Sequence, residues 1–231
     1  GLVYEKINRI PKNNEVKVKV EAVGLNHMDI WVRNGIKNFS FPLPLIPGCD
    51  MVGRVLECGA DSKKVKPGDR VVVSAGYGCG YCSHCLAGNV AFCKDFGLLG
   101  EFADGTQRET LCLDERFFFP ISEDLPLEQA ATIGVAQLTA FEMLVKKGGV
   151  SAGDKVLVCG ASAGVGFAAV GLAKHYGANV FALVSKADKR KRMKELYPDL
   201  ELIDSSDSKW FKSLKDKAGN QSIDIVIDSI G

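Results

Sequence analysis

The segment that decides the fold of this chain is residues 155–166, KVLVCGASAGVG. Residues 155–159 are apolar after the first lysine, which predicts a buried strand, and Gly160 begins a run of small residues that predicts a tight turn. Helical spacing follows over residues 164–176, and a second apolar stretch follows over residues 179–184. This order predicts two parallel strands joined by a crossover helix.

The rest of the second half continues the alternation of strands and helices. Helices are expected at residues 128–147, 189–197 and 208–217, and strands at residues 201–203 and 222–228. Because the strands are apolar on both faces, this alternation predicts a parallel sheet that is covered by helices on both sides.

The turn after the first of these strands has the features of a dinucleotide-binding turn. Small residues let the backbone approach a pyrophosphate, and the N-terminus of the following helix presents free N–H groups to it. The strict pattern G-x-G-x-x-G aligns with Ala161, Ala163 and Gly166, so alanine replaces two of its three glycines. We expect Ala163, Gly164, Val165 and Gly166 to contact the cofactor. The alternative is a tight turn in some other doubly wound protein.

The residues about twenty positions further on favour NADPH over NADH as this cofactor. An NAD site places Asp or Glu there for the ribose hydroxyls, whereas this chain has Ser185 and Lys186, which suit a 2′-phosphate. Lys189 or Arg190 could reach the same phosphate, although this basic run could also be the solvated face of a helix. We interpret Asp188 as a residue of the first helical turn rather than as the ribose-binding acid.

The first half of the chain has strand periodicity instead. Residues 15–23 alternate charged and apolar side chains with period two, which predicts a strand with one face in water. Further strands are expected at residues 52–57, 70–74 and 117–120. The sequence therefore predicts a mostly β region followed by an α/β region.

Four of the eight cysteines lie within fifteen residues and have the spacing of zinc ligands. Cys79, Cys82, Cys85 and Cys93 are separated by two, two and seven residues, so their thiolates can reach one tetrahedral ion. Four sulfur ligands leave no open coordination position, so a zinc ion here stabilises a loop and cannot activate water or substrate. The alternatives are paired disulfides or four free thiols, and His84 is surplus to a four-cysteine site.

The composition is that of an ordinary soluble globular protein. The 231 residues are 46% hydrophobic and 25% charged, and a net charge of +1 gives no field that attracts nucleic acid or an anionic membrane. No apolar run approaches the ~20 residues that span a bilayer, and no signal-peptide pattern is present. We therefore expect a cytoplasmic protein whose partner is a small-molecule substrate, not nucleic acid or a membrane.

With both motifs in place, the chain resembles the medium-chain dehydrogenase/reductase superfamily, in its zinc-type alcohol dehydrogenase and quinone oxidoreductase branches. The resemblance is carried by residues 16–22, GLNHMD at 24–29, PGCDMVG at 47–53, KPGDRV at 66–71, the four-cysteine lobe, residues 130–141 and the glycine-rich turn. It implies two domains. These are a GroES-like, mostly β domain over residues 1–125, with the zinc lobe at 79–93, and an α/β Rossmann-type dinucleotide-binding domain over residues 126–231.

The resemblance also implies segments before and after these residues. The Rossmann domain is expected to be truncated after its fourth strand, so we expect a partial chain. The complete protein is expected to form a homo-oligomer, as many relatives do.

In alcohol dehydrogenases of this superfamily, three protein ligands hold a catalytic zinc ion, and the resemblance locates their positions here. They correspond to Asn26, Cys49 and Gly134. Catalytic zinc normally has three protein ligands, and this set does not supply them. The alternative is a site rebuilt from Cys49, Asp50 and His27.

The pattern of Asn26 and Asp29 with Asp50 instead resembles that of zinc-free quinone oxidoreductases. It implies an NADPH-dependent reductase of quinones or α,β-unsaturated carbonyls that transfers hydride directly, with one structural zinc ion and no catalytic zinc. By analogy, Asn26 lies beside nicotinamide or substrate, Asp29 braces its loop, Asp50 braces the site or handles a proton, and Thr139 lies near the nicotinamide carboxamide. The rivals are a zinc-dependent alcohol dehydrogenase with altered ligands and a non-enzymatic nucleotide-sensing protein.

Overall fold

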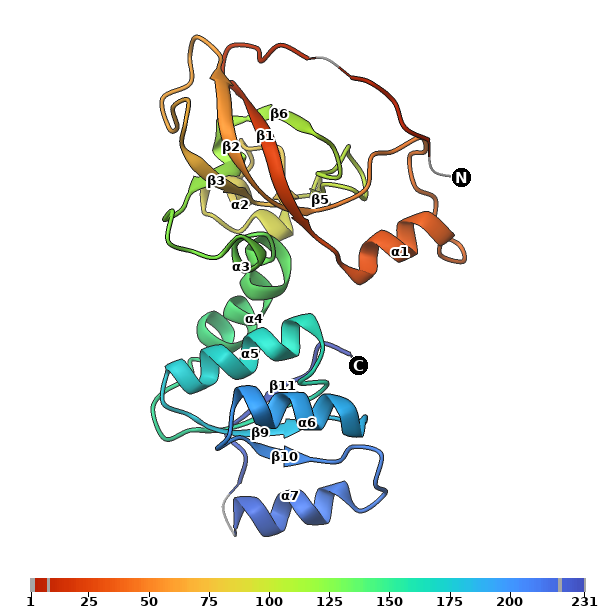
Figure 1. Cartoon of the computed structure of the whole chain (residues 1–231), viewed down its shortest axis with the longest axis vertical. Coiled ribbons are helices and arrows are strands. Elements are labelled where there is room, and N and C mark those ends of the chain that lie inside the picture. Colours follow the sequence, from red (N-terminus) through yellow and green to blue (C-terminus); the bar gives the residue numbers. More distant parts are fainter. Residues whose placement is uncertain (1–2, 8, 220–221, 231) are drawn as a thin grey trace. The chain divides into compact units, whose positions relative to one another are not determined.

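The structure is a computed structural model that describes residues 3–7, 9–219 and 222–230 (Figure 1). In this part of the chain, no helix is long and apolar enough to cross a membrane. The contacts divide the chain into two compact units, Gly1–Val135 and Ala136–Gly231.

The division between the units lies after Val135, whereas the sequence placed the boundary after residue 125. The intervening segment packs with the first unit because Ala130 and Ala131 are buried against two valines of its sheet. The short helix α3 (Leu127–Ala130) therefore belongs to the first unit.

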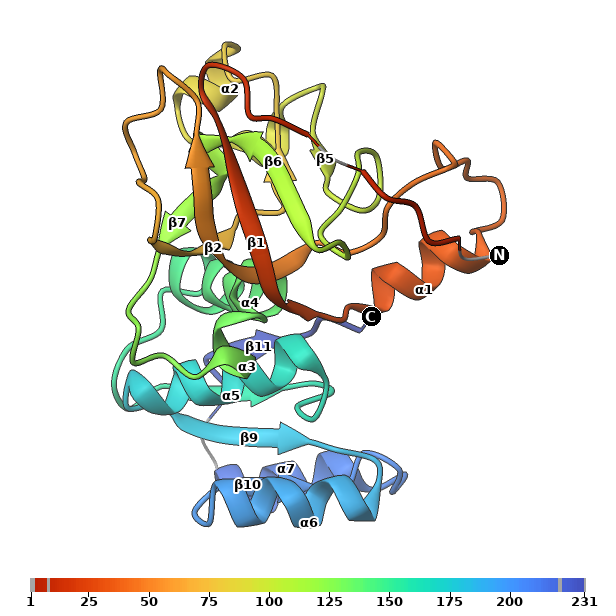
Figure 2. The ribbon, with the colours of Figure 1, turned by 45° about the horizontal axis from the view of Figure 1, so that its top comes forward.

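The first unit is built on a five-stranded antiparallel sheet with the order β6-β1-β2-β3-β7. Figure 2 shows β6, β1 and β2 side by side. The strands are β1 (Glu15–Gly24), β2 (Asp50–Cys58), β3 (Arg70–Val73), β6 (Thr110–Asp114) and β7 (Phe118–Pro120). The strands predicted at residues 15–23, 52–57, 70–74 and 117–120 are confirmed as β1, β2, β3 and β7, and residue 117 itself lies in a preceding 3-10 turn.

Along β1, charged and apolar side chains alternate, and the apolar ones are buried as predicted. Val16 and Val18 are fully buried, whereas Lys17 is half-buried and Lys19 is exposed. Apolar side chains from the other strands complete a single core, to which Met51, Val55, Val71, Leu111 and Phe118 contribute. Burial of these side chains holds the sheet and positions the loops at its ends.

Helix α1 (His27–Asn34) and strand β6 are among the elements of the first unit that were not predicted. Helix α1 occupies a segment that the sequence analysis treated as loop, and β6 pairs with β1 along the opposite edge from β2. The start of α1 is fixed by a reciprocal cap, in which Oδ2 of Asp29 accepts a hydrogen bond from the backbone N–H of Asn26 at 2.8 Å. Strand β6 is held by burial of Leu111 and Cys112.

The second unit contains a four-stranded parallel sheet, as predicted, and its strand order is β10-β9-β8-β11. Its strands are β8 (Lys155–Val158), β9 (Asn179–Leu183), β10 (Glu201–Ile203) and β11 (Ile225–Ile227). Its crossover helices are α5 (Gly164–His175), α6 (Ala187–Leu196) and α7 (Trp210–Ala218). Figure 1 shows α5 and α7 on opposite sides of this sheet.

Alternate residues of β8 divide the core of the second unit into two layers. Val156 and Val158 are buried in a cluster that includes Ala169 and Val170 of α5. Leu157 points to the other face, into a cluster that includes Leu214 of α7. The strands are apolar on both faces because helices cover both faces, which confirms the expected fold class.

The prediction of one continuous helix at residues 128–147 was wrong, because the segment is divided into several helical pieces. After α3 the chain turns at Thr132, whose Oγ1 donates to the carbonyl of Gln129 at 3.0 Å. Helical structure then resumes in wider π-helical turns on either side of α4 (Leu138–Phe141). Such π turns frequently occur at functional sites.

Candidate functional site

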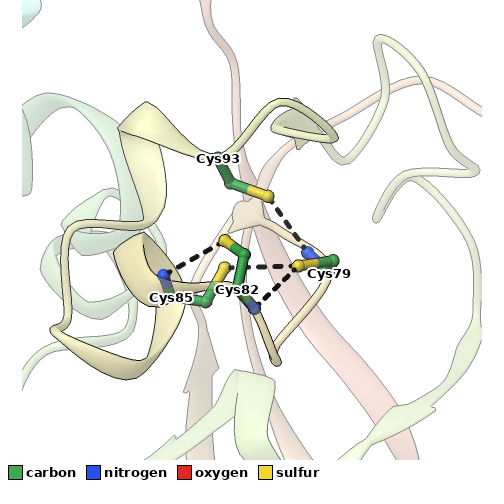
Figure 3. Close-up of side chains that lie close together, drawn as sticks. All are labelled: Cys79, Cys82, Cys85 and Cys93. Atoms are coloured by element: carbon green, nitrogen blue, oxygen red, sulfur yellow. Dashed lines mark hydrogen bonds between the residues drawn. The ribbon is translucent and has the colours of Figure 1, made fainter.

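The four clustered cysteines form one compact group in the first unit (Figure 3). Their sulfur atoms all lie within 4.8 Å of one another, and Sγ of Cys79 lies 3.9 Å from Sγ of Cys85. A tetrahedral ion with zinc–sulfur bonds of about 2.3 Å requires sulfur atoms about 3.8 Å apart. None of the eight cysteines is in a disulfide bond in this structure.

The backbone around this cysteine group is shaped to bring the sulfurs together. Helix α2 (Ser83–Leu86) lies inside the lobe, between the paired strands β4 (Gly76–Tyr77) and β5 (Gly97–Leu98). A Cβ atom on Gly78 would lie 2.9 Å from Sγ of Cys85, so only glycine fits there. Backbone N–H groups donate to three of the sulfurs at 3.3–3.5 Å. This donor set is compatible with a structural zinc ion.

His84 does not join the cysteine group. Its ring lies against Phe92, with centroids 5.9 Å apart, and the side chain is exposed. This position agrees with the expectation that His84 is not a ligand of the four-cysteine site.

A second group of polar side chains lies where β1 ends and β2 begins. Nδ2 of Asn26 donates to Oδ2 of Asp50 at 2.8 Å and to Sγ of Cys49 at 3.3 Å. Oδ1 of Asp29 accepts from the backbone N–H of Gly48 at 3.1 Å. The three candidate catalytic residues predicted from the sequence are therefore brought together, and Asp29 holds the loop before β2 against the start of α1.

Asp50 is the most unusual member of this group, because a carboxyl group with 1% exposure is rarely left without a cation. Its Oδ1 atom meets no donor at hydrogen-bonding geometry within the described residues. Burial raises the pKa of Asp50 to about 6, opposed by the amide of Asn26 and by the nearby backbone N–H groups of Val135 and Gly134. Asp50 can therefore exchange a proton close to neutral pH.

Two glycines press against Asp50 and leave no room for further side chains. A Cβ atom on Gly134 would lie 2.6 Å from Oδ1 of Asp50, and one on Gly24 would lie 2.9 Å from its Cβ. Burial and the adjacent carboxylate of Asp50 raise the pKa of the Cys49 thiol to about 12. The carboxyl group of Asp50 is thus enclosed by protein, and Cys49 is a neutral thiol at neutral pH.

His27 lies apart from this group. Its ring packs edge-on against Trp31, with centroids 5.0 Å apart, and it is exposed on α1. Among the described residues, only the four clustered cysteines bring together three or more ligand atoms. In this structure the ligand atoms of Cys49, Asp50 and His27, the residues of the alternative rebuilt site, are therefore not gathered into one group.

The glycine-rich turn of the second unit has the close packing expected of a nucleotide-binding turn. A Cβ atom on Gly166 would lie 2.4 Å from the carbonyl oxygen of Gly160, so the helix can approach the strand only with glycine there. Ala163 precedes α5 and offers no capping side chain. The N–H groups of the first turn, at Gly164, Val165 and Gly166, lack partners inside the helix and remain free for an anion.

A pocket of about 350 Å³ opens beside this turn, at the carboxyl ends of the parallel strands. Ligands bind at this edge in open α/β sheets. Its lining includes Ala163 from the turn and Ser185 and Lys189 after β9. Of the three basic residues considered for the phosphate, Lys189 lines the pocket, whereas Lys186, at the N-cap of α6, and Arg190 do not.

The comparisons with known proteins agree with these two units. Residues 12–123 match the family described as alcohol dehydrogenase GroES-like domain. The chain is 29% identical over 221 residues to quinone oxidoreductase of Homo sapiens. The aligned region is 96% of this chain and 59% of that protein. The chain is 33% identical over 222 residues to 2-methylene-furan-3-one reductase of Solanum lycopersicum, covering 95% and 50%. The crystal structure of an NAD-dependent alcohol dehydrogenase superposes with a TM-score of 0.91 at 38% identity, covering 99% of this chain and 66% of that one.

The chain belongs to the medium-chain dehydrogenase/reductase superfamily. The resemblance stated from the sequence is thereby confirmed, together with the pairing of a GroES-like unit with a Rossmann-type unit. The chain spans about three fifths of the length of the curated quinone oxidoreductase that it matches.

Thr139 is not placed at the nucleotide pocket by the structure. It is exposed on α4, in the second unit, and is not among the residues that line the pocket. Its assignment to the nicotinamide carboxamide stays a prediction from the superfamily resemblance.

Several residues of the two sites were missed by the sequence analysis. Thr106 is fully buried and its Oγ1 donates to the backbone carbonyl of Asp50 at 2.9 Å, which fixes the start of β2. Ser205, which follows β10, lines the same pocket as Ser185, which follows β9. No local motif marks Thr106, whereas Ser205 lies two residues after a predicted parallel strand, in the region where ligand-binding residues are expected.

Proposed function

We propose that the protein is an NADPH-dependent reductase of quinones or α,β-unsaturated carbonyl compounds, with a structural zinc ion in the cysteine lobe and no catalytic metal ion. The single observation that carries this proposal is the enclosed contact between Asn26 and Asp50. The amide group of Asn26 donates to the Asp50 carboxylate at 2.8 Å, at the position where alcohol dehydrogenases of the superfamily place a metal-binding cysteine.

The donor chemistry of this site suits a catalytic zinc ion poorly. Asn26 carries an amide in place of a thiolate, and its Nδ2 donates to Oδ2 of Asp50 at 2.8 Å. Gly134 offers no side chain, and a Cβ atom there would lie 2.6 Å from Asp50. Fewer than three protein ligands are therefore available, whereas catalytic zinc sites normally supply three.

Reduction of an already electrophilic carbon needs less assistance than alcohol oxidation does. Bound NADPH supplies the hydride, and the protein orients the reactants and handles charge and protons. Asn26 is held in one orientation by Asp50, and Asp29 holds the loop that carries Cys49. Asp50 is itself enclosed by protein, so its role in this proposal is to orient the Asn26 amide and not to contact the product.

The preference for NADPH rests on the polar residues of the nucleotide pocket. Lys189 is exposed, lines the pocket and has no ion-pair partner among the described residues, and Ser185 adds a hydroxyl group. A cation and a hydroxyl suit the 2′-phosphate of NADPH. We expect Lys189→Ala to raise KM for NADPH by about tenfold with little change for NADH, because only NADPH carries this phosphate. Steady-state kinetics with both cofactors tests this, and an unchanged ratio of the two KM values would refute the assignment.

The proposed reaction is tested by following NADPH oxidation by the full-length protein with a panel of substrates. The panel contains a quinone, a cyclic enone, an aldehyde and, with NADP⁺, a primary alcohol. We expect turnover with the quinone or the enone and none with the alcohol. Turnover confined to the aldehyde and alcohol would support the zinc-type alcohol dehydrogenase. NADPH binding without turnover of any of the four would support a nucleotide-sensing protein.

A further inference from the structure

We infer that Arg190 acts as a positioning residue for the 2′-phosphate of NADPH: it neutralises Asp204 and fixes the turn that carries Ser185, and it does not bind the phosphate itself. This inference rests on the proposed function, in which NADPH is the cofactor. It differs from the expectation that Arg190 is one of the cations that reach the phosphate.

The guanidinium group of Arg190 is engaged on two sides. Its Nη1 donates to the backbone carbonyl oxygens of Val184 at 2.9 Å and Ser185 at 2.7 Å. Its Nη2 lies 2.7 Å from Oδ2 of Asp204, and the side chain is only 24% exposed. The guanidinium group can contact backbone carbonyls and a carboxylate at the same time, since it presents five N–H donors in a fixed planar geometry.

These contacts join the two strand ends that form one wall of the nucleotide pocket. Val184 and Ser185 follow β9 and line the pocket, and Ser205, the neighbour of Asp204, follows β10 and lines it too. The ion pair between Arg190 and Asp204 therefore lies directly behind this wall. Lys189, the preceding residue on α6, lines the pocket itself and is the cation available to a phosphate.

The ion pair also affects the charge close to the pocket, whose own lining carries Lys189 and Asp228. Asp204 follows β10, one strand beyond the position of the acid that binds the ribose hydroxyls in NAD sites, and its negative charge would repel a nearby 2′-phosphate. Asp204 is held in place independently of Arg190, because its Oδ1 accepts from the backbone N–H of Ser206 at 2.9 Å and from its hydroxyl at 2.6 Å. Removing Arg190 would therefore leave an uncompensated negative charge beside the site of the 2′-phosphate.

The test uses two small ligands that differ only in this phosphate, adenosine 2′,5′-bisphosphate and adenosine 5′-monophosphate, with the full-length protein. We expect Arg190→Gln to weaken the bisphosphate about tenfold, from repulsion by Asp204, and the monophosphate less than about twofold. Adding Asp204→Asn to Arg190→Gln should restore bisphosphate affinity to within about threefold of wild type, because the two charges act as a pair.

A matched control is Lys174→Gln. Lys174 pairs with Asp199 at 2.5 Å in the same unit, but near the amino end of β10, away from the nucleotide pocket. This control should leave the ratio of the two dissociation constants unchanged.

Three results would count against these assignments in different ways. If the wild-type protein binds both ligands equally, the proposed NADPH preference fails. If it prefers the bisphosphate but Arg190→Gln weakens both ligands equally, Arg190 has only a structural role and the inference is overturned. If Arg190→Gln is selective but Asp204→Asn does not restore affinity, Arg190 binds the phosphate directly, which also overturns the inference.

Discussion

The buried carboxyl group of Asp50 makes the stability of the first unit depend on pH, and Asp50→Asn should remove that dependence. Asp50 is 1% exposed, and burial raises its pKa from the ordinary 3.8 to about 6. Because the pKa is raised in the folded state, the stabilisation that it gives is complete below about pH 4 and is lost as the pH rises through 6. At about 1.4 kcal/mol for each pKa unit, this loss amounts to about 3 kcal/mol.

The comparison of wild type with Asp50→Asn isolates this contribution, since asparagine has no proton to release. The free energy of unfolding of the wild type, relative to that of the variant, should fall by about 3 kcal/mol between about pH 4 and pH 7. Urea unfolding at a series of pH values measures it. The fluorescence of Trp31, on α1, reports the first unit when Trp210, in the second unit, is replaced by Phe in both proteins.

Two results would refute this reasoning about Asp50. A difference that stays constant with pH would show that the pKa of Asp50 is not raised in the folded protein. A difference that grows in favour of the wild type as the pH rises would show a lowered pKa, as expected for a carboxylate that faces a cation. The second result would also weaken the proposal that this site lacks a metal ion.

Three other substitutions have consequences that follow directly from the geometry. Arg70→Met should lower the free energy of unfolding, measured by urea denaturation, by about 3 kcal/mol. The reason is that the buried guanidinium donates to three backbone carbonyls, including that of Leu125 at 2.7 Å. A loss below about 1 kcal/mol would contradict this. Gly166→Ala should abolish adenosine 2′,5′-bisphosphate binding in calorimetry, since its Cβ would lie 2.4 Å from the carbonyl oxygen of Gly160; retained affinity would show that the turn can relax. Cys93→Ser should reduce bound zinc, measured by elemental analysis, at least tenfold if the cysteine group holds the ion; unchanged zinc would place the ion elsewhere.

The architecture was predictable because its signals are local and periodic. The alternation of Val16 and Val18 with lysines fixed the buried face of β1, and the apolar run at residues 155–159 fixed a central strand of the parallel sheet. The cysteine group was predictable for a similar reason, since spacing alone brings four sulfurs together. Hydrophobic period and ligand spacing are properties that one sequence displays fully.

One missed feature had a local signal, and the others depend on contacts between distant residues. Asn26 and Asp29 were assigned to a loop, although an asparagine with an acidic residue three positions later is a recognisable helix start. The enclosure of Asp50 depends on Gly134, which lies far away in the sequence, so its raised pKa has no local signal. Arg190 lies in a basic run, and its ion pair with the distant Asp204, which helps to distinguish it from Lys189, has no signal in the sequence.

The central claim is that this protein reduces activated carbonyl compounds with no metal ion at Cys49 and Asp50. It is tested most directly by measuring zinc per chain in the full-length protein together with its rate of NADPH oxidation by a quinone or an enone. We predict about one zinc ion per chain, held by the four cysteines, in protein that turns over at its full rate. About two zinc ions per chain, with turnover that falls in proportion as the second ion is removed by a chelator and returns when zinc is added back, would contradict the account.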